Sequence, residues 1–305
     1  MSAIKVEKLH SLTGHRDCVY TIVPSGFPNL FFSGGGEGMI VKWDLTNPSE
    51  GELIARLPNS IYSLCAIPDS NLLIAGHNYE GIHVLDWKEK KEVASLQITK
   101  GAIFDIRYFE KDVLVTTGEG SLIIVNLQNR VIKKKLAISE KSARVLALNP
   151  KTKEVAIGFS DNKIRIFSLR DYALMYEFEA HKNSVFALGY THDYKFLISG
   201  SRDARLKAWQ VDKEYKQAGE VAAHLFAINH LAFSPSGEYF ATASMDKSIK
   251  IWKTDELKLL KVIDKGRHAG HGTSVNKLVW TNFKNQLISA SDDRTISVWD
   301  LAFTG

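Results

Sequence analysis

The hydrophobic and polar positions of the chain follow a pattern typical of paired β-strands. Three segments show it most clearly. Each has a short run of apolar and β-branched residues, a polar turn, and a second run in which apolar and polar residues alternate. These segments cover residues 196–209, 240–252 and 287–299. Alternation with a period of two, interrupted by a turn, predicts a β-hairpin and not an amphipathic helix.

The same unit recurs along the whole chain. Four tryptophans each lie 28 positions after a histidine, and the pairs are His15 and Trp43, His181 and Trp209, His224 and Trp252, and His271 and Trp299. Weaker copies end at Leu85, Val125 and Phe167, so that equivalent positions follow one another at intervals of 40 to 47 residues. Self-similarity at such a period is the signature of a repeat architecture, here with seven units.

These units resemble the repeats of the WD-repeat β-propeller family. The resemblance rests on Gly-His pairs at 14–15 and 270–271, on the turn aspartates Asp203, Asp246 and Asp293, and on Trp-Asp pairs at 43–44 and 299–300. It implies an all-β fold, a seven-bladed β-propeller with four antiparallel strands per blade, as one domain over residues 1–305. Only five residues follow Asp300, whereas residues 4–12 read as a strand. We therefore expect residues 1–12 to supply the outer strand of the C-terminal blade and to close the ring, as in the family.

The resemblance also assigns the recurring polar residues to the scaffold. In the family, a loop histidine, a strand hydroxyl, the turn aspartate and the tryptophan form one buried hydrogen-bonded chain. Complete sets here are His181, Ser199, Asp203 and Trp209; His224, Thr242, Asp246 and Trp252; and His271, Ser289, Asp293 and Trp299. The first unit keeps His15, Ser33 and Trp43, with Glu37 in the place of the aspartate. Ser, His and Asp together suggest a catalytic triad, but three copies at the repeat spacing favour a structural network.

Units two to four depart from this pattern. We place Leu57, Thr99 and Lys141 at the histidine position, and the tryptophan is lost in the same three units. Asp161 remains alone and is expected to cap its own turn. These blades are predicted to be the softer half of the ring, because they lack the hydrogen-bonded chain. A metal site at His268 and His271 is not favoured, since no third ligand is near in sequence.

The first strand of each unit carries the functional signal. Aliphatic residues stand four and seven positions after the histidine, as in Val19 and Ile22, and a spacing of three breaks the period of two of a regular strand. This predicts a β-bulge that redirects the residue after the first aliphatic. Around the ring that residue is Tyr20, Tyr62, Phe104, Leu146, Phe186, Asn229 and Asn276.

The resemblance to the family implies that this position lies at the rim of the central channel, on the face where partners dock. Two neighbouring positions add Arg144, Arg202, Met245 and Asp292. Aromatic and arginine side chains dominate binding hot spots, so we predict a partner-binding face. Its residues are Tyr20, Tyr62, Phe104, Arg144, Phe186, Arg202, Asn229, Met245 and Asn276. The alternative is that the aromatics pack between blades as core.

Composition and charge narrow the function classes. The content of 45% hydrophobic and 24% charged residues is that of an ordinary globular protein. The net charge is +5, but the basic runs at 88–91 and 133–135 are short and favour solvated strand edges over a nucleic-acid patch. No apolar run reaches the length of a membrane span, and the N-terminus has no apolar signal-peptide core. Two cysteines, Cys18 and Cys65, are no disulfide framework, and we expect a cytoplasmic protein.

The favoured function is therefore a non-enzymatic interaction scaffold without cofactor or metal. Its upper face would bind a peptide or partner loop, alone or as a subunit of a larger complex. Such a peptide would offer an acidic or aliphatic group to Arg144 and Arg202, and an apolar or cationic group to the aromatics. Two alternatives stay open: an enzyme or small-ligand binder that uses the central funnel, and, less favoured, a nucleic-acid-associated subunit.

Overall fold

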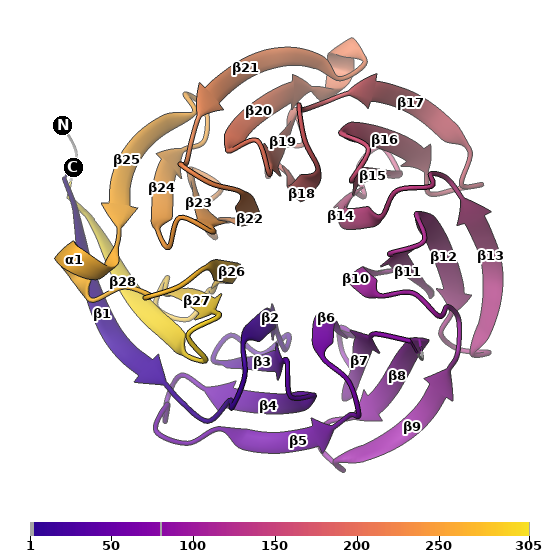
Figure 1. The fold of residues 1–305 in the computed structure, drawn as a ribbon, viewed down its shortest axis with the longest axis horizontal. Helices are drawn as coiled ribbons and strands as arrows, with labels where there is room; N and C mark the ends of the chain where they lie inside the picture. Colours follow the sequence, from indigo (N-terminus) through magenta and orange to yellow (C-terminus); the bar gives the residue numbers. More distant parts are fainter. Residues whose placement is uncertain (1–2, 80, 305) are drawn as a thin grey trace.

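The computed structural model describes residues 3–79 and 81–304. Within these ranges the strands form antiparallel sheets of four strands each, seven in number. The sheets stand as blades around one axis, each with one strand innermost and one outermost (Figure 1). The fold class predicted from the repeats, an all-β seven-bladed propeller, is confirmed.

The first four blades each run outward from their innermost strand, so that consecutive strands are neighbours. Blade one consists of β2 (Val19–Pro24), β3 (Leu30–Gly35), β4 (Met39–Asp44) and β5 (Glu52–Arg56). Blade two consists of β6 (Ile61–Ala66), β7 (Leu72–His77), β8 (Gly81–Asp86) and β9 (Lys91–Leu96). Blade three consists of β10 (Ile103–Phe109), β11 (Asp112–Thr117), β12 (Ser121–Asn126) and β13 (Val131–Ala137). Blade four consists of β14 (Ala143–Asn149), β15 (Glu154–Phe159), β16 (Lys163–Ser168) and β17 (Leu174–Glu179).

The remaining blades follow the same plan until the last, whose outer strand comes from the other end of the chain. Blade five consists of β18 (Val185–Tyr190), β19 (Phe196–Ser201), β20 (Arg205–Gln210) and β21 (Lys216–Ala222). Blade six consists of β22 (Ile228–Phe233), β23 (Tyr239–Ser244), β24 (Ile249–Lys253) and β25 (Lys258–Ile263). Blade seven consists of β26 (Val275–Trp280), β27 (Leu287–Ser291), β28 (Ile296–Thr304) and β1 (Ala3–Leu12). Two short helices, η1 (Val211–Lys213) and α1 (Lys265–His268), lie in connections.

The N-terminal strand closes the ring, as predicted. β1 pairs antiparallel with β28 over its whole length, from Ala3 opposite Thr304 to Leu12 opposite Ile296. Figure 1 shows the two ends of the chain side by side at the periphery. Because β1 covers the edge of β28, the last blade presents one outer strand edge like every other blade. That residues 1–305 act as one folding unit stays a prediction.

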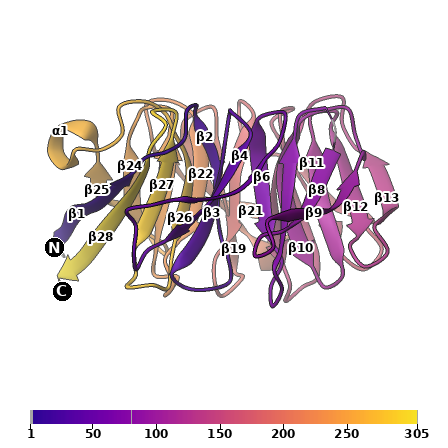
Figure 2. The same cartoon turned by 90° about the horizontal axis from the view of Figure 1, so that it is seen from below.

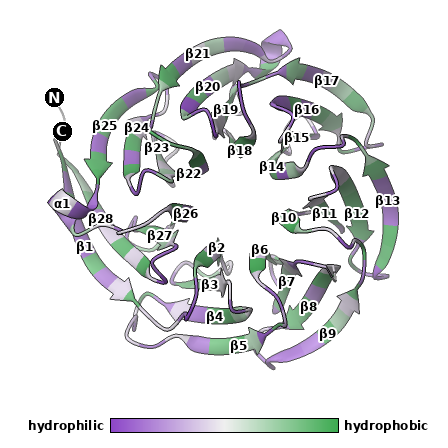
Figure 3. Cartoon of the chain, in the orientation of Figure 1, coloured by the Kyte–Doolittle hydropathy of each residue, from purple (hydrophilic) through white to green (hydrophobic). Residues whose placement is uncertain are grey.

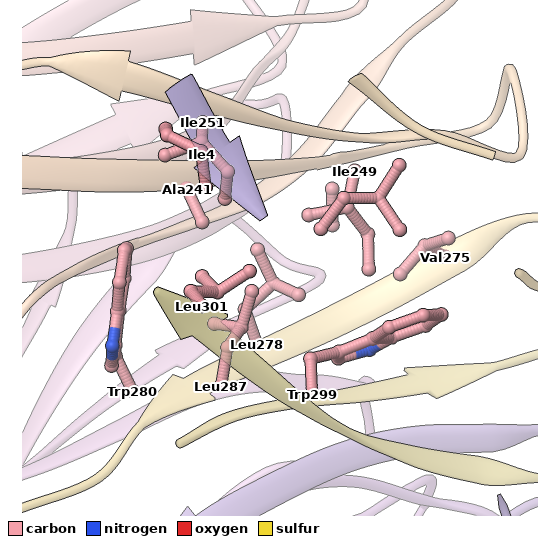
Figure 4. Close-up of a cluster of buried hydrophobic side chains, with 12 residues drawn as sticks. Ile4, Ala241, Ile249, Ile251, Val275, Leu278, Trp280, Leu287, Trp299 and Leu301 are labelled. Carbon is pink, nitrogen blue, oxygen red and sulfur yellow. The ribbon is translucent and has the colours of Figure 1, made fainter. Parts of the chain in front are cut away.

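Hydrophobic side chains fill the spaces between neighbouring blades. One such cluster joins Ile249 and Ile251 of blade six to Trp280 and Trp299 of blade seven and to Ile4 of β1 (Figure 4). The inner strands are largely hydrophobic, whereas outer strands such as β9 and β13 carry hydrophilic stretches (Figure 3). Each blade therefore depends on its neighbours for its core, which is why a ring of such units is stable and one unit alone is not.

Seen from the side, the strands run across the thickness of a disc and the connections gather on its two faces (Figure 2). The basic run at 133–135 lies in the outer strand β13, where the three lysines are exposed. No helix in the described part of the chain is long and apolar enough to cross a membrane.

Candidate partner-binding face at the central channel

A β-bulge near the start of the innermost strand of every blade points one residue at the channel. The register shifts fall between Val19/Thr21, Ile61/Ser63, Ile103/Asp105, Ala143/Val145, Val185/Ala187, Ile228/His230 and Val275/Lys277. A bulge is present in all seven blades, and in six of them it lies at the residue inferred from the aliphatic spacing. The residues at these bulges, here called the channel ring, are Tyr20, Tyr62, Phe104, Arg144, Phe186, Asn229 and Asn276.

Blade four corrects the sequence-based assignment. Its bulge residue is Arg144, whereas Leu146, which we expected there, is completely buried. The residue at the histidine position is Ser139 and not Lys141, because the Ser139 hydroxyl donates to the carboxylate of Asp161 at 2.8 Å. The 22 residues from Ser139 to Asp161 equal the interval from His181 to Asp203. The 28-residue interval counted back from Phe167 also reaches Ser139, so the sequence held the marker that the placement at Lys141 missed.

Five members of the channel ring form a continuous arc. The rings of Tyr20 and Tyr62 are 4.9 Å apart between centroids, and those of Tyr62 and Phe104 are 6.2 Å apart. The Arg144 guanidinium lies 4.1 Å from the centroid of Phe104 and 5.5 Å from that of Phe186. All five side chains are partly exposed, so they contact each other and still present surface to the channel.

The two asparagines of the ring hold neighbouring blades together. The Asn229 amide of blade six donates to the Ser274 hydroxyl at 2.9 Å and to the Val275 carbonyl at 2.8 Å in blade seven. The Asn276 amide donates to the Val19 carbonyl at 3.0 Å and to Asp292 at 2.7 Å. Both N–H groups of each amide are therefore engaged within the protein, which leaves the arc from Tyr20 to Phe186 as the open part of the ring.

A cavity of about 260 Å³ opens at the centre of this face, and the channel ring lines it together with Asp105, Val145 and Lys277. The sequence analysis did not single out Asp105 or Lys277. Each directly follows a ring residue, which is the signal that was available. Burial lowers the pKa of Lys277, although the nearby Asp105 acts in the opposite direction. The Lys277 ammonium group thus lies in the wall of the cavity, where it has lost part of its hydration shell.

Deeper in the channel, Asp105 is already engaged. It is buried, and its oxygens accept hydrogen bonds from the backbone N–H groups of Ile106 at 3.0 Å and Leu146 at 2.9 Å. The Arg107 guanidinium lies 3.3 Å from the same carboxylate. Asp105 thus forms its ion pair with Arg107 and acts on Lys277 only from beyond ion-pair distance, where its charge still raises the lysine pKa.

Other predicted residues lie at the margin of the same face. Arg202 is exposed. The pKa of Arg144 is lowered mainly by burial of its guanidinium, and the nearby positive charge of Arg202 lowers it further. Met245 is 51% exposed, and its backbone N–H donates to the Ala227 carbonyl at 3.0 Å, next to Leu225 and Phe226, which are more exposed than Met245. This face therefore carries cations near its centre and an exposed apolar patch of Leu225, Phe226 and Met245 in blade six.

The polar sets of blades five, six and seven form the same hydrogen-bonded chain three times. In blade six the Trp252 indole N–H donates to the Thr242 hydroxyl at 2.9 Å, and that hydroxyl lies 2.7 Å from Nε2 of His224. Nδ1 of His224 lies 2.8 Å from the Asp246 carboxylate. A neutral histidine that carries its proton on Nδ1 satisfies every group, from tryptophan through hydroxyl and imidazole to carboxylate. The corresponding chains are Trp209, Ser199, His181 and Asp203, and Trp299, Ser289, His271 and Asp293.

Each turn aspartate is held as a carboxylate. Burial alone would raise the pKa of Asp246, but the hydrogen bond and charge of His224 and the backbone N–H of Leu225 outweigh it and lower the pKa well below its usual value. The pKa values of Asp203 and Asp293 are lowered for the same reasons. These chains are buried within single blades and line no part of the central cavity.

Blade one keeps the chain with a longer acid. Trp43 donates to the Ser33 hydroxyl at 2.8 Å, which lies 2.7 Å from Nε2 of His15. Nδ1 of His15 contacts the Glu37 carboxylate, which also accepts the backbone N–H of Asp17 at 3.0 Å. Among the described residues, glutamate keeps the contacts to the histidine and the loop but does not accept the backbone N–H two positions on, as Asp203, Asp246 and Asp293 do.

The model of the WD domain, G-beta repeat, matches residues 6–44, 173–210, 215–253 and 262–300, which is half of the chain. The chain belongs to this WD40 repeat family. Each match ends one residue after the tryptophan of blade one, five, six or seven, the blades in which the hydrogen-bonded chain is complete. The strands β6 to β16 of blades two to four lie outside the matched ranges, and these blades have neither the histidine nor the tryptophan of the repeat.

Several curated WD40 relatives cover nearly the whole chain. Actin-interacting protein 1-2 of Arabidopsis thaliana is 25% identical over 297 residues, which are 94% of this chain and 47% of the relative. Actin-interacting protein 1 of Drosophila melanogaster is 24% identical over 305 residues, 95% of this chain and 47% of the relative. Protein groucho of Drosophila melanogaster is 20% identical over 249 residues, which are 79% of this chain and 34% of the relative. The chain thus spans about half the length or less of these relatives.

The divergent WD40 blades replace the histidine by other polar contacts. In blade three the Thr99 hydroxyl donates to Glu119 at 2.9 Å, and in blade four Ser139 donates to Asp161. The expectation that Asp161 stands alone is therefore wrong, because it has side-chain partners. It caps its turn through the backbone N–H of Lys163, and it also contacts Arg165 at 2.8 Å. The link between loop and turn survives without the imidazole, although the path to a tryptophan does not.

Proposed function

We propose that the face around the central channel binds a peptide segment or loop of another protein, and that the chain acts as an interaction scaffold without catalysis of its own. The carrying observation is the arc of Tyr20, Tyr62 and Phe104 beside Arg144 at an open cavity. Such side chains supply most of the binding energy at protein interfaces. Two relatives are named for an interaction with actin, which supports a role in protein binding and does not identify the partner.

The arrangement of the aromatics supports the binding face over the alternative that they are core. Their ring contacts run along the channel wall, and each side chain keeps partial exposure to the cavity. The polar sets that suggest catalysis are buried inside the blades, away from that cavity. We also propose a cytoplasmic location, because Cys18 and Cys65 are free thiols, as is usual in a reducing compartment.

A pull-down with quantitative comparison of the retained proteins tests the proposal. The test variant carries alanine at Tyr20, Tyr62 and Phe104. The control carries alanine at Val131, Ile132 and Leu174, which are exposed on the outer strands of blades three and four. We expect the test variant to lose partners that wild type and control both retain. A test variant that melts as a folded protein and keeps every partner would refute the proposal.

A further inference from the structure

Three cations on the proposed binding face lack a counter-ion. In the described part of the chain, no carboxylate oxygen lies within ion-pair distance of Arg144, Arg202 or Lys277. Some other cations of the blades are paired, as Arg165 is with Asp161 and Glu177. Arg144, Arg202 and Lys277 differ from other unpaired cations in that they lie together on the face with the cavity. Unpaired cations gathered at a cavity raise the local potential and attract a complementary anion.

Arg144 is held in place for such a role. Its guanidinium lies between the rings of Phe104 and Phe186, and its Nε donates to the Ser160 hydroxyl at 2.8 Å. Neither terminal nitrogen has an acceptor in the described part of the chain, so both remain available for a bidentate contact with a carboxylate. Because the side chain is already ordered by its neighbours, a ligand loses little free energy to immobilise it.

Lys277 adds a second cation inside the cavity. The one acid of the cavity lining, Asp105, is balanced by Arg107, so the lining carries a net positive charge. Burial lowers the pKa values of both Arg144 and Lys277. The charge of Arg202 adds to this effect on Arg144, whereas for Lys277 the charge of Asp105 opposes it and that of Arg107 adds to it. An anionic group placed between them would relieve this repulsion and replace part of their lost hydration.

An apolar patch on the same face supplies a second anchor. Leu225 is 83%, Phe226 is 62% and Met245 is 51% exposed, and they meet where the loop before β22 contacts the turn after β23. Exposed large apolar side chains grouped in this way mark a contact surface. The face therefore combines a cationic centre with an apolar margin.

We propose that the partner is a peptide segment with an aspartate or glutamate side chain that enters the cavity between Arg144 and Lys277, while a neighbouring apolar side chain packs on Leu225, Phe226 and Met245. This inference rests on the proposed function and specifies the chemistry of its ligand. Charge complementarity selects the acidic group, and the apolar patch selects a peptide over a free carboxylate.

Selection of a library of random peptides displayed on phage, with their C-termini fused to the coat protein, tests this on the purified full chain. We expect peptides enriched in Asp or Glu beside an apolar residue. A synthetic peptide of the selected sequence should bind about tenfold or more weakly when its acid is changed to the amide, or when the protein carries Arg144→Met or Lys277→Met. Lys153→Met removes the same charge in the β14–β15 turn at the opposite face and should leave affinity unchanged.

The outcomes separate the two proposals. Selected peptides that need Tyr62 but show no acidic enrichment and tolerate Lys277→Met would overturn the acidic-ligand inference and preserve the binding face. Peptides that are indifferent to both Tyr62→Ala and Lys277→Met would overturn both. Binding of a single-stranded oligonucleotide that is lost in Lys277→Met, with no acidic peptide selected, would assign the cavity to phosphate and also overturn the inference.

Discussion

Replacement of Thr242 by valine isolates the contribution of one hydrogen-bonded chain. Valine has nearly the shape of threonine but lacks the hydroxyl that accepts from Trp252 at 2.9 Å and lies 2.7 Å from His224. Thr242 is completely buried, so water cannot take the place of the hydroxyl. The indole N–H and the imidazole Nε2 both lose their partner, and the aspartate beyond them does not compensate.

The expected cost follows from these two orphaned groups. A buried polar group without a partner costs about 1 to 3 kcal/mol, so the variant with two such groups should lose about 2 to 6 kcal/mol of unfolding free energy. With an unfolding entropy of about 2.1 cal/mol/K per residue over 305 residues, this lowers the melting temperature by about 3 to 9 °C. Thr242→Ser keeps the hydroxyl and loses one methyl group, which should cost about 1 kcal/mol.

Differential scanning calorimetry of wild type, Thr242→Val and Thr242→Ser distinguishes hydrogen bonding from packing. The serine variant should melt between the other two. If the valine variant is as stable as wild type, or if serine is the more damaging replacement, the chain does not contribute to stability as argued. Ser289→Ala in blade seven repeats the test, because it orphans Trp299 and His271 in the same way.

Three further predictions follow from the same structure. The lowered pKa of Asp246 means that its stabilisation is complete above the unfolded value of about 3.9 and is lost as the pH falls through and below it; urea midpoints should therefore drop more steeply on acidification in wild type than in Asp246→Asn. Deletion of residues 1–12 removes β1 from β28, together with the buried Ile4 and Leu12, and should lower the melting temperature sharply; unchanged stability would contradict ring closure by β1. Amide hydrogen exchange should be faster in blades two to four than in blades five to seven; equal exchange rates in all blades would contradict the prediction that blades two to four are the less stable half of the ring.

Much of the scaffold could be predicted from the sequence because its structural unit repeats. Seven copies let the well-marked blades define the unit, and the weak copies were then placed by spacing. Blade four was misplaced although its spacing is regular, because Lys141 was taken for the histidine position where the 28-residue interval from Phe167 gives Ser139; the ring residue is therefore Arg144 and not Leu146. The error was local because the period of the strands on either side was unaffected.

The candidate site was less predictable. The bulge identified the aromatic arc, but Lys277 and the engagement of Asn229 and Asn276 depend on contacts between blades. A residue type alone does not reveal whether an amide faces a ligand or the next blade. Nor does it reveal that Arg107 already neutralises Asp105 while Lys277 stays unpaired.

The repeat pattern of the sequence was enough to predict seven β-rich units, because hydrophobic alternation and turn residues are local properties that recur in each repeat. The propeller, its closing strand and the hydrogen-bonded chains were implied by the family resemblance of those repeats, and the structure shows all three. Only the tertiary structure decided which cations remain unpaired at the channel. Charge balance there depends on side chains from blades three, four, five and seven, which are far apart in sequence and meet only when the ring closes. The histidines and tryptophans with which the repeats were found hold the blades, and the candidate site lies in the space that the blades enclose.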